Sequence, residues 1–222
     1  MGLMFSGCGD SAPSDDISME SEKFIYAVSV KNLTLAQPMS PVALAYHDRG
    51  VSLFEVGRSA SVGLEKLAEG GDNSVLLSSL STEGKVHASK SGLGLIKPSK
   101  SETIMIEGKE AMCMSVSTML VNTNDAFAGV SCVDVSQMKV GDKLMRELIT
   151  YDAGTELNSE TASSIPGPAG GGEGFNAMRD DFKNFVSVHA GIVSKDDGLN
   201  SSDLSQKHRW NNPTGMLVIE RK

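Results

Sequence analysis

The sequence is poor in cysteine and histidine and has no long apolar run, and each shortage excludes a class of protein. Three cysteines in 222 residues are too few for a disulfide framework, and they match no metal-ligand spacing. The four histidines are scattered, with no His-x-x-x-His pair of the zinc-binding kind. No stretch approaches the ~18 consecutive apolar residues of a membrane-spanning helix. A zinc fold, a disulfide-built fold and a membrane span are therefore not indicated.

Positive charge is also in short supply. The chain has 20 Lys and Arg against 28 Asp and Glu, which gives a net charge of −8 at pH 7. Duplex nucleic acid is bound through clustered basic side chains that displace counterions, so the composition argues against a nucleic-acid partner. An acidic chain does suit cations. A Gly-x-Ser-x-Gly elbow, a P-loop and a dinucleotide fingerprint are likewise missing from the sequence.

The chain does contain enough apolar sequence for a core. Hydrophobic residues make up 40% and charged residues 22%, ordinary values for a globular protein that exclude disorder over the whole length. A length of 222 residues fits one large domain or two small ones, and an all-β sandwich of this size routinely forms a single domain.

Strand patterns dominate the chain. Phe24, Tyr26, Val28 and Val30 alternate with smaller or polar residues, and this period of two predicts a half-buried strand. The predicted strands are residues 24–30, 42–46, 85–89, 102–107, 112–121, 127–133, 144–151, 185–189 and 216–220.

Two short helices are predicted between the second and third of these strands. Residues 59–67 have apolar side chains at helical spacing, and Gly70-Gly71 supplies a stop. Asp72 is predicted to cap a second helix over residues 73–80. Together the elements predict an all-β fold, an antiparallel β-sandwich with two short helices inserted near its N-terminal part.

Two of the cysteines leave an alternative open. Cys113 and Cys132 lie on consecutive predicted strands. A disulfide between them is feasible in an oxidising compartment, and two buried free thiols fit the sequence equally well.

The third cysteine, Cys8, belongs to a different pattern. Residues 5–8, Phe-Ser-Gly-Cys, resemble a bacterial lipobox, in which the cysteine carries a lipid after cleavage. The basic region and most of the apolar region of a complete signal peptide are absent, so the start is truncated or the match is a coincidence. We expect residues 1–20 to be a signal remnant, lipidated at Cys8, with a polar linker, and residues 21–222 to form the domain.

Two carboxylates, Asp152 and Glu156, stand four residues apart around Gly154, at the end of a predicted strand. Ca²⁺ takes about six to eight oxygen ligands, and a strand end that turns through Ala-Gly can direct several oxygens to one point. One turn cannot fill this shell, so a third acid is needed, and Asp125 lies in a loop between two predicted strands. The alternative is that these are ordinary turn acids, because Asp favours turns by bonding to its own backbone.

The interval 154–181 leaves directly from this predicted site. It is long and lacks a secondary-structure pattern, and such intervals are usually functional or disordered. Its glycines at 170–174 are expected to form a flexible run and not a phosphate cradle, since no strand and helix frame them.

Metal-assisted hydrolysis is a second chemistry for the same acids. His47 and His189 fall at the ends of predicted strands, where either could join Asp125 and Asp152 around an open coordination position. A hydrogen-bonded structural histidine is the more common outcome. A histidine within reach of the metal favours a hydrolase, and an all-oxygen shell favours a binding module.

Short blocks of sequence also carry a family resemblance. They are residues 32–34, 37–41, 47, 53–57, 60–64, 67–69, 124–129, 151–156, 165–168 and 218–221. The most telling is Asp-Ala-Gly-Thr at 152–155, followed by an acid. In this order the blocks make the sequence similar to the spondin domain, the module in the amino-terminal half of F-spondin that also occurs alone in bacterial secreted proteins.

The resemblance implies a β-sandwich related to the calcium-binding C2 type, with one Ca²⁺ held by loop carboxylates at one end. Asp125, Asp152 and Glu156 match the ligand positions, although F-spondin has an aspartate where Glu156 stands. Glutamate is longer by one methylene and can chelate bidentately, so calcium is still accommodated with a changed geometry. Asn124, Thr155 and nearby backbone carbonyls could complete the shell.

The resemblance implies no catalytic activity. It leads us to expect a calcium-binding interaction module of the adhesion type, secreted or lipid-anchored in the bacterial cell envelope, whose partner is an extracellular protein or glycan. Contact with a membrane is expected only through the N-terminal lipid. Calcium-dependent binding to a lipid surface is the remaining alternative, and it needs basic or apolar loop tips, of which Phe127 is the one near the site.

Overall fold

A computed structural model describes residues 1–2, 23–109, 112–178 and 183–222. Residues 5–8, the predicted lipobox with Cys8, lie outside these ranges. Within the described part of the chain, two α-helices and three short 3₁₀ helices accompany the strands. The strands are β1 (Phe24–Asn32), β2 (Ala43–His47), β3 (Val86–Ser91), β4 (Ser101–Gly108), β5 (Cys113–Met119), β6 (Ala126–Asp134), β7 (Lys143–Asp152), β8 (Ser187–Val188) and β9 (Gly215–Arg221). The helices are α1 (Val62–Gly70), α2 (Ser74–Ser81), η1 (Ala162–Ser164), η2 (Lys195–Asp197) and η3 (Gln206–His208).

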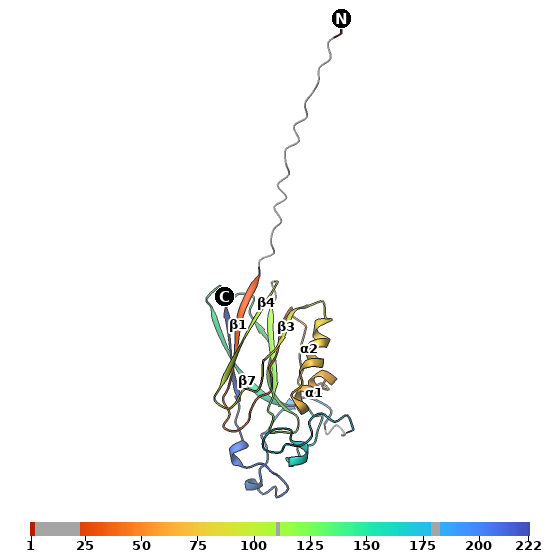
Figure 1. The fold of residues 1–222 in the computed structure, drawn as a ribbon, viewed down its shortest axis with the longest axis vertical. Helices are drawn as coiled ribbons and strands as arrows, with labels where there is room; N and C mark the ends of the chain where they lie inside the picture. The colour runs from red at the N-terminus through yellow and green to blue at the C-terminus, as the bar shows by residue number, and fades with distance from the viewer. Residues whose placement is uncertain (3–22, 110–111, 179–182) are drawn as a thin grey trace.

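The strands form one continuous antiparallel sheet in the order β3-β2-β5-β6-β7-β9-β1-β4, with β8 added beside β7. Strand β7 belongs to both halves of this sheet, because Lys143–Leu148 pair with β9 and Ile149–Asp152 pair with β6. The sheet folds over at this strand into two facing layers, and Figure 1 shows the nearly closed result. The predicted all-β fold with short helices near its start is confirmed.

The main core lies between the two layers. Tyr26 of β1 and Tyr46 of β2 meet across it with ring centroids 5.4 Å apart, and both side chains are buried. Alternate residues of β1, namely Tyr26, Val28 and Val30, point into this core, as the period of two predicted. Apolar burial of this kind is the main stabilising term of the fold.

Both α-helices cover the outer face of the β2–β5–β6 layer (Figure 1). Helix α1 begins at the cap Ser61, whose hydroxyl accepts the Leu64 N–H, and ends at Gly71 with φ 70°. The cap of α2 is Asn73 and not Asp72 as predicted, although an Asp72 carboxylate oxygen does accept the Ser74 N–H at 2.9 Å. Asn73 instead donates its amide to the Pro41 carbonyl and the Ser91 hydroxyl.

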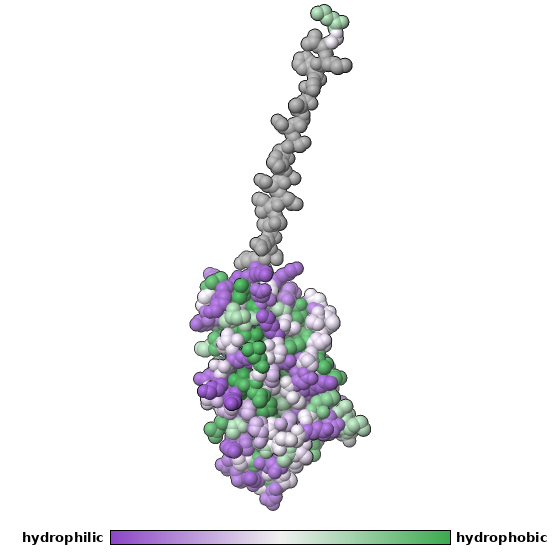
Figure 2. Space-filling model, in the orientation of Figure 1, coloured by the Kyte–Doolittle hydropathy of each residue, from purple (hydrophilic) through white to green (hydrophobic). Residues whose placement is uncertain are grey.

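The structure joins Cys113 and Cys132 in a disulfide between β5 and β6. The bridge, and not a pair of free thiols, is therefore present. No helix among the residues described is long and apolar enough to cross a membrane. Figure 2 shows a surface of mixed hydropathy, with hydrophilic residues gathered toward both ends of the sandwich.

The glycines at 170–174, expected to form a flexible run, pack against neighbouring backbone at two positions. A Cβ on Gly172 would lie 2.2 Å from the Ala162 carbonyl oxygen, and one on Gly170 would lie 2.5 Å from the Ile165 oxygen. The Gly172 N–H also donates to the Ile165 carbonyl at 2.9 Å. Glycine is required at these two positions because two backbone segments pack directly against each other.

Candidate metal centre

The three predicted acids come together at one end of the sandwich. Asp125 ends the turn between β5 and β6, and Asp152 is the last residue of β7. The pairing of β6 with β7 places Ala126 opposite Asp152, and the Ala153 N–H donates to the Asp125 carbonyl at 3.2 Å. Figure 1 places the loops that follow β7 at the end of the molecule away from the C-terminus.

The turn after β7 brings Glu156 back to Asp125. Gly154 has φ 76°, and a Cβ there would lie 2.5 Å from the Phe185 carbonyl oxygen, so the position requires glycine. Its N–H donates to Asp152 Oδ1 at 2.9 Å, closing a tight Asp turn. The N–H groups of Thr155 and Glu156 then both donate to Asp125 Oδ2, at 2.9 and 3.2 Å.

Asp125 lies in a surrounding that disfavours its negative charge. Its side chain is fully buried, and burial together with the nearby Asp152 carboxylate raises its pKa to about 8 against the opposing effect of the two N–H donors. One of its oxygens, Oδ1, has no hydrogen-bond partner among the described residues. The Thr155 hydroxyl, also buried, is unpartnered in the same part of the structure.

Both oxygens of Asp152 accept hydrogen bonds, and Glu156 is held through Oε1. Asp152 Oδ2 accepts the Asn158 side-chain amide at 2.8 Å and lies 3.4 Å from the Lys183 ammonium. Glu156 Oε1 accepts the Asn124 amide at 3.0 Å. Protein donors therefore contact at least one oxygen of each of the three carboxylates, and Oδ1 of Asp125 is a buried oxygen without a hydrogen-bond partner in the described structure.

The donor set suits Ca²⁺ in kind, because it consists of carboxylate, hydroxyl and carbonyl oxygens. Unpartnered buried oxygens on Asp125 and Thr155 are what an oxygen-loving cation would satisfy. In the residues described, however, no three His, Cys, Asp or Glu side chains stand in an arrangement that holds a metal ion. Binding would therefore need the carboxylates to turn away from the amide and ammonium donors that they now contact.

The two predicted histidines differ in position. His47 is remote from the acids, buried between the Ser115 hydroxyl and the Asp48 carbonyl, each 2.8 Å from a ring nitrogen. His189 lies near Asp152 and is buried, and this burial lowers its pKa to about 4 against the opposing effect of Asp152. Its Nδ1 accepts the Gly191 N–H at 2.9 Å, so in the neutral ring the proton must sit on Nε2.

Sequence reasoning missed three residues around the site: Asn158, Lys183 and Glu160. Asn158 follows the acidic turn closely, and an amide just beyond two acids was a usable signal. Lys183 is 31 residues from Asp152 along the chain and is brought there by the long excursion after β7, which no pattern predicted. Glu160 is buried, has φ 58°, and its N–H donates to the Asn124 side chain.

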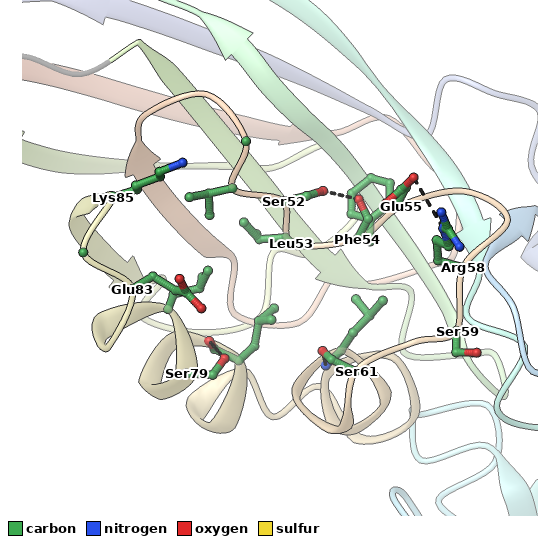
Figure 3. Close-up of a pocket in the computed structure, with 16 residues that line it drawn as sticks. Ser52, Leu53, Phe54, Glu55, Arg58, Ser59, Ser61, Ser79, Glu83 and Lys85 are labelled. Atoms are coloured by element: carbon green, nitrogen blue, oxygen red, sulfur yellow. Dashed lines mark hydrogen bonds and ion pairs between the residues drawn. The ribbon is translucent and has the colours of Figure 1, made fainter.

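A separate hollow of about 670 Å³ lies between residues 50–61 and the two α-helices (Figure 3). Its floor is apolar and includes Leu53, Leu64 and Leu80. Its rim carries hydroxyl groups and an exposed Glu55–Arg58 ion pair at 3.7 Å. None of the three acids lines it, so this hollow is distinct from the candidate metal centre.

The fold and this loop end define an antiparallel sandwich with an acidic cluster at the end of its seventh strand. The family model described as Spondin_N matches residues 32–168, more than half of the chain, and the match includes Asp125, Asp152 and Glu156. The chain therefore belongs to the spondin family, as predicted. No curated protein matches it.

Proposed function

We propose that this chain is a calcium-binding interaction module of the adhesion type, in which Asp125, Asp152 and Glu156 hold one Ca²⁺. Its partner would be an extracellular protein or glycan. We further propose that it acts outside the cell or in the cell envelope, held there by a lipid on Cys8. Membership of the spondin family supports this function, and the acidic cluster supplies the candidate site.

One observation carries the proposal: Asp125 is fully buried beside two other carboxylates, and its Oδ1 lacks a partner in the described structure. An unpaired buried carboxylate oxygen costs about 1–3 kcal/mol or more, so a fold retains one where something else satisfies it. A divalent cation would satisfy this oxygen and remove the repulsion that raises the Asp125 pKa.

The ion would then serve as a structural part. It would tie the turn before β6 to the turn after β7, and through Glu156 to the excursion that follows. Extracellular calcium modules often bind with dissociation constants of about 10⁻⁴ to 10⁻³ M, so the site would stay filled where calcium is abundant. The loops fixed in this way are where we place the partner-binding surface.

Thermal unfolding tests the proposal. The full chain is melted in EDTA, in millimolar Ca²⁺ and in millimolar Mg²⁺, and the series is repeated with Asp152→Ala. At ~10 mM Ca²⁺, about 10 to 100 times a dissociation constant of ~10⁻³ to 10⁻⁴ M, the ion would stabilise the native state by ~1.4 to 2.7 kcal/mol, a readily measured shift. Asp142→Ala is the matched control, because Asp142 is also a turn acid, accepting the Lys139 N–H at 2.8 Å, but lies at the opposite end of β7.

We expect Ca²⁺ to raise the midpoint temperature of unfolding of the wild type and of Asp142→Ala. The midpoint temperature of Asp152→Ala should be the same with and without Ca²⁺. Mg²⁺ should have little effect, because it demands a tighter octahedral shell and gives up its waters reluctantly. Identical curves in all three buffers, on protein shown to be free of metal, would return the three acids to ordinary turn roles.

Hydrolysis is less well supported than binding. His189 is the histidine nearest the acids that we identify, but its Nδ1 already accepts a backbone N–H and its Nε2 bears the proton. Neither nitrogen offers a lone pair to a metal or to a water, and the lowered pKa reflects a buried neutral ring. A hydrolase would need this ring to give up its bond to Gly191.

Calcium-dependent binding to a lipid surface was predicted to need an apolar loop tip near the site, and Phe127 was the candidate. Phe127 is fully buried, with its ring 4.9 Å from that of Phe54 and 5.6 Å from that of Tyr151. It is a core residue under the helices and not a loop tip. We therefore place a protein or glycan partner ahead of a membrane surface.

A further inference from the structure

Lys183 places a positive charge against the acidic cluster. Its Nζ lies 3.4 Å from Oδ2 of Asp152, and the Asp152 side chain is only 3% exposed. The Lys183 side chain is 36% exposed. A buried carboxylate is thus paired with a cation that also reaches solvent.

The backbone around Lys183 is fixed beside the site. The N–H groups of Lys183 and Asn184 both donate to the Gly154 carbonyl, at 3.2 and 3.0 Å, and the Val186 N–H donates to the Arg58 carbonyl at 2.8 Å. The long side chain has four rotatable bonds and an outlet to water, so it can move without disturbing these bonds. The backbone therefore tethers the ammonium close to Asp152, while part of the side chain is open to solvent.

Resting on the proposed function, we propose that Lys183 is a tethered competitor of the calcium ion. Its ammonium compensates the acids in the ion-free protein and leaves Asp152 for solvent when Ca²⁺ binds. Two cations a few ångströms apart repel strongly in a buried site, so both do not share this carboxylate comfortably. The ion prevails because it carries two charges and draws on three carboxylates.

The same competition selects against monovalent ions. A group on a short tether has an effective concentration in the millimolar range or above. Na⁺ or K⁺ carries no more charge than the ammonium and has no tether, so neither displaces it readily. Lys183 would therefore weaken calcium binding and, in return, keep the site from filling with the wrong cation.

Calorimetric titration of the full chain with Ca²⁺ tests this role, using the wild type, Lys183→Met, Lys183→Arg and a control, Lys143→Met. Lys143 begins the strand that Asp152 ends, roughly 30 Å away along β7. It makes an ion pair of the same 3.4 Å length, with Glu220. The control Lys143→Met thus removes one lysine charge and one ion pair of similar length, but at a place far from the acids.

We expect Lys183→Met to tighten calcium binding about fivefold or more, a coupling at the low end of those found between sites. The calcium affinity of Lys183→Arg should remain close to that of the wild type. Lys143→Met should change the calcium affinity less than roughly twofold, because salt screens the effect of one distant charge. In EDTA, Lys183→Met should unfold at a lower temperature than the wild type, because the acids lose their compensating cation. Replacing choline chloride by KCl at equal ionic strength should weaken calcium binding to Lys183→Met more than binding to the wild type.

Two failures are distinguishable. Calcium binding that depends on Asp152 but is equal in the wild type and Lys183→Met would overturn the role of Lys183 and leave the proposed function standing. No binding by any variant, with each shown to be folded by its melting curve, would overturn both.

Discussion

Glu160 is a buried carboxyl group that is not one of the three acids of the candidate metal centre. It is 2% exposed, and its Oε1 accepts the Val193 N–H at a long 3.4 Å, while Oε2 has no partner in the described part of the chain. Burial raises its pKa from 4.5 to about 7. In the native protein the group therefore prefers its proton well above the pH at which it would ionise in an unfolded chain.

The raised pKa predicts a loss of stability with rising pH. Glu160 contributes fully below about pH 4.5, and its contribution falls as the pH rises through about 7, because the unfolded chain then ionises more readily than the native one. Glu160→Gln keeps the neutral shape and cannot ionise. We expect this variant to be more stable than the wild type at pH 8 by up to about 3 kcal/mol and to differ little at pH 4.5.

Denaturant unfolding from pH 4.5 to 8 in calcium-free buffer measures this difference, and Glu83→Gln, at an exposed glutamate, is the control. Every other ionisable group is common to the wild type and Glu160→Gln, so the difference between the two isolates Glu160. A constant difference across the pH range would mean that the pKa of Glu160 is not raised in the native protein.

The turn after β7 brings the three acids together, and Gly154 is the position in this turn where we expect a side chain to be tolerated least. Alanine at Gly154 would meet two costs, a backbone at φ 76° and a Cβ 2.5 Å from the Phe185 carbonyl oxygen. Gly171, in the same excursion, has φ 73°, but a Cβ added there would meet no atom within 4 Å. Comparing alanine at Gly154 with alanine at Gly171 therefore separates the cost of a positive φ from the cost of a steric clash at Cβ.

We expect Gly171→Ala to destabilise the protein by about 1 kcal/mol and Gly154→Ala by about 3 kcal/mol or more, because in the latter the turn must shift. The shift would move the N–H groups that hold Asp125, so calcium-induced stabilisation should be lost in Gly154→Ala and kept in Gly171→Ala. Thermal melts with and without Ca²⁺ read both effects. Equal losses of stability in the two variants would contradict the collision argument.

The regular elements could be predicted from the sequence because each follows from a local pattern. All nine predicted strands are present among the described residues, and the alternation at Tyr26, Val28 and Val30 correctly identified the core face of β1. The predicted strand at 185–189 shortens to Ser187–Val188, because Val186 bonds across to Gly57 and Arg58 and leaves β7 there. The length of this strand therefore depends on the loop that contains Gly57 and Arg58, which is distant in sequence.

The site was predicted in part for the same reason. Asp152 and Glu156 share one turn, and Asp125 lies in the turn beside it, so spacing and resemblance sufficed to predict that the three acids are neighbours, and their role as ligands stays a proposal. Lys183 reaches Asp152 only through a long excursion without regular structure. Its place is set by contacts such as those at Gly154, which no periodicity encodes, so its role could not be read from the sequence.

In the whole molecule, the candidate metal centre and the main core are distinct. The core lies between the two layers and is built from strands such as β1, β4 and β9, none of which carries a predicted ligand. The centre sits at one end and is held by turns. Loss of the ion should therefore loosen that end and leave the layers intact.

Hydrogen exchange with and without calcium tests this division over the whole chain. In EDTA we expect residues 153–178 and 183–186 to exchange faster, by about tenfold or more, because their bonds to the acidic turn lose the ion that fixes it. Amides in β1, β4 and β9 should exchange at equal rates in both buffers, since their ladders and core contacts do not involve the site. Asp152→Ala supplies the control, because it should show the fast pattern in either buffer. Faster exchange spread evenly over both layers would mean that the ion stabilises the entire fold. The candidate metal centre would then unfold together with the core, and the ion would not stabilise the loops alone.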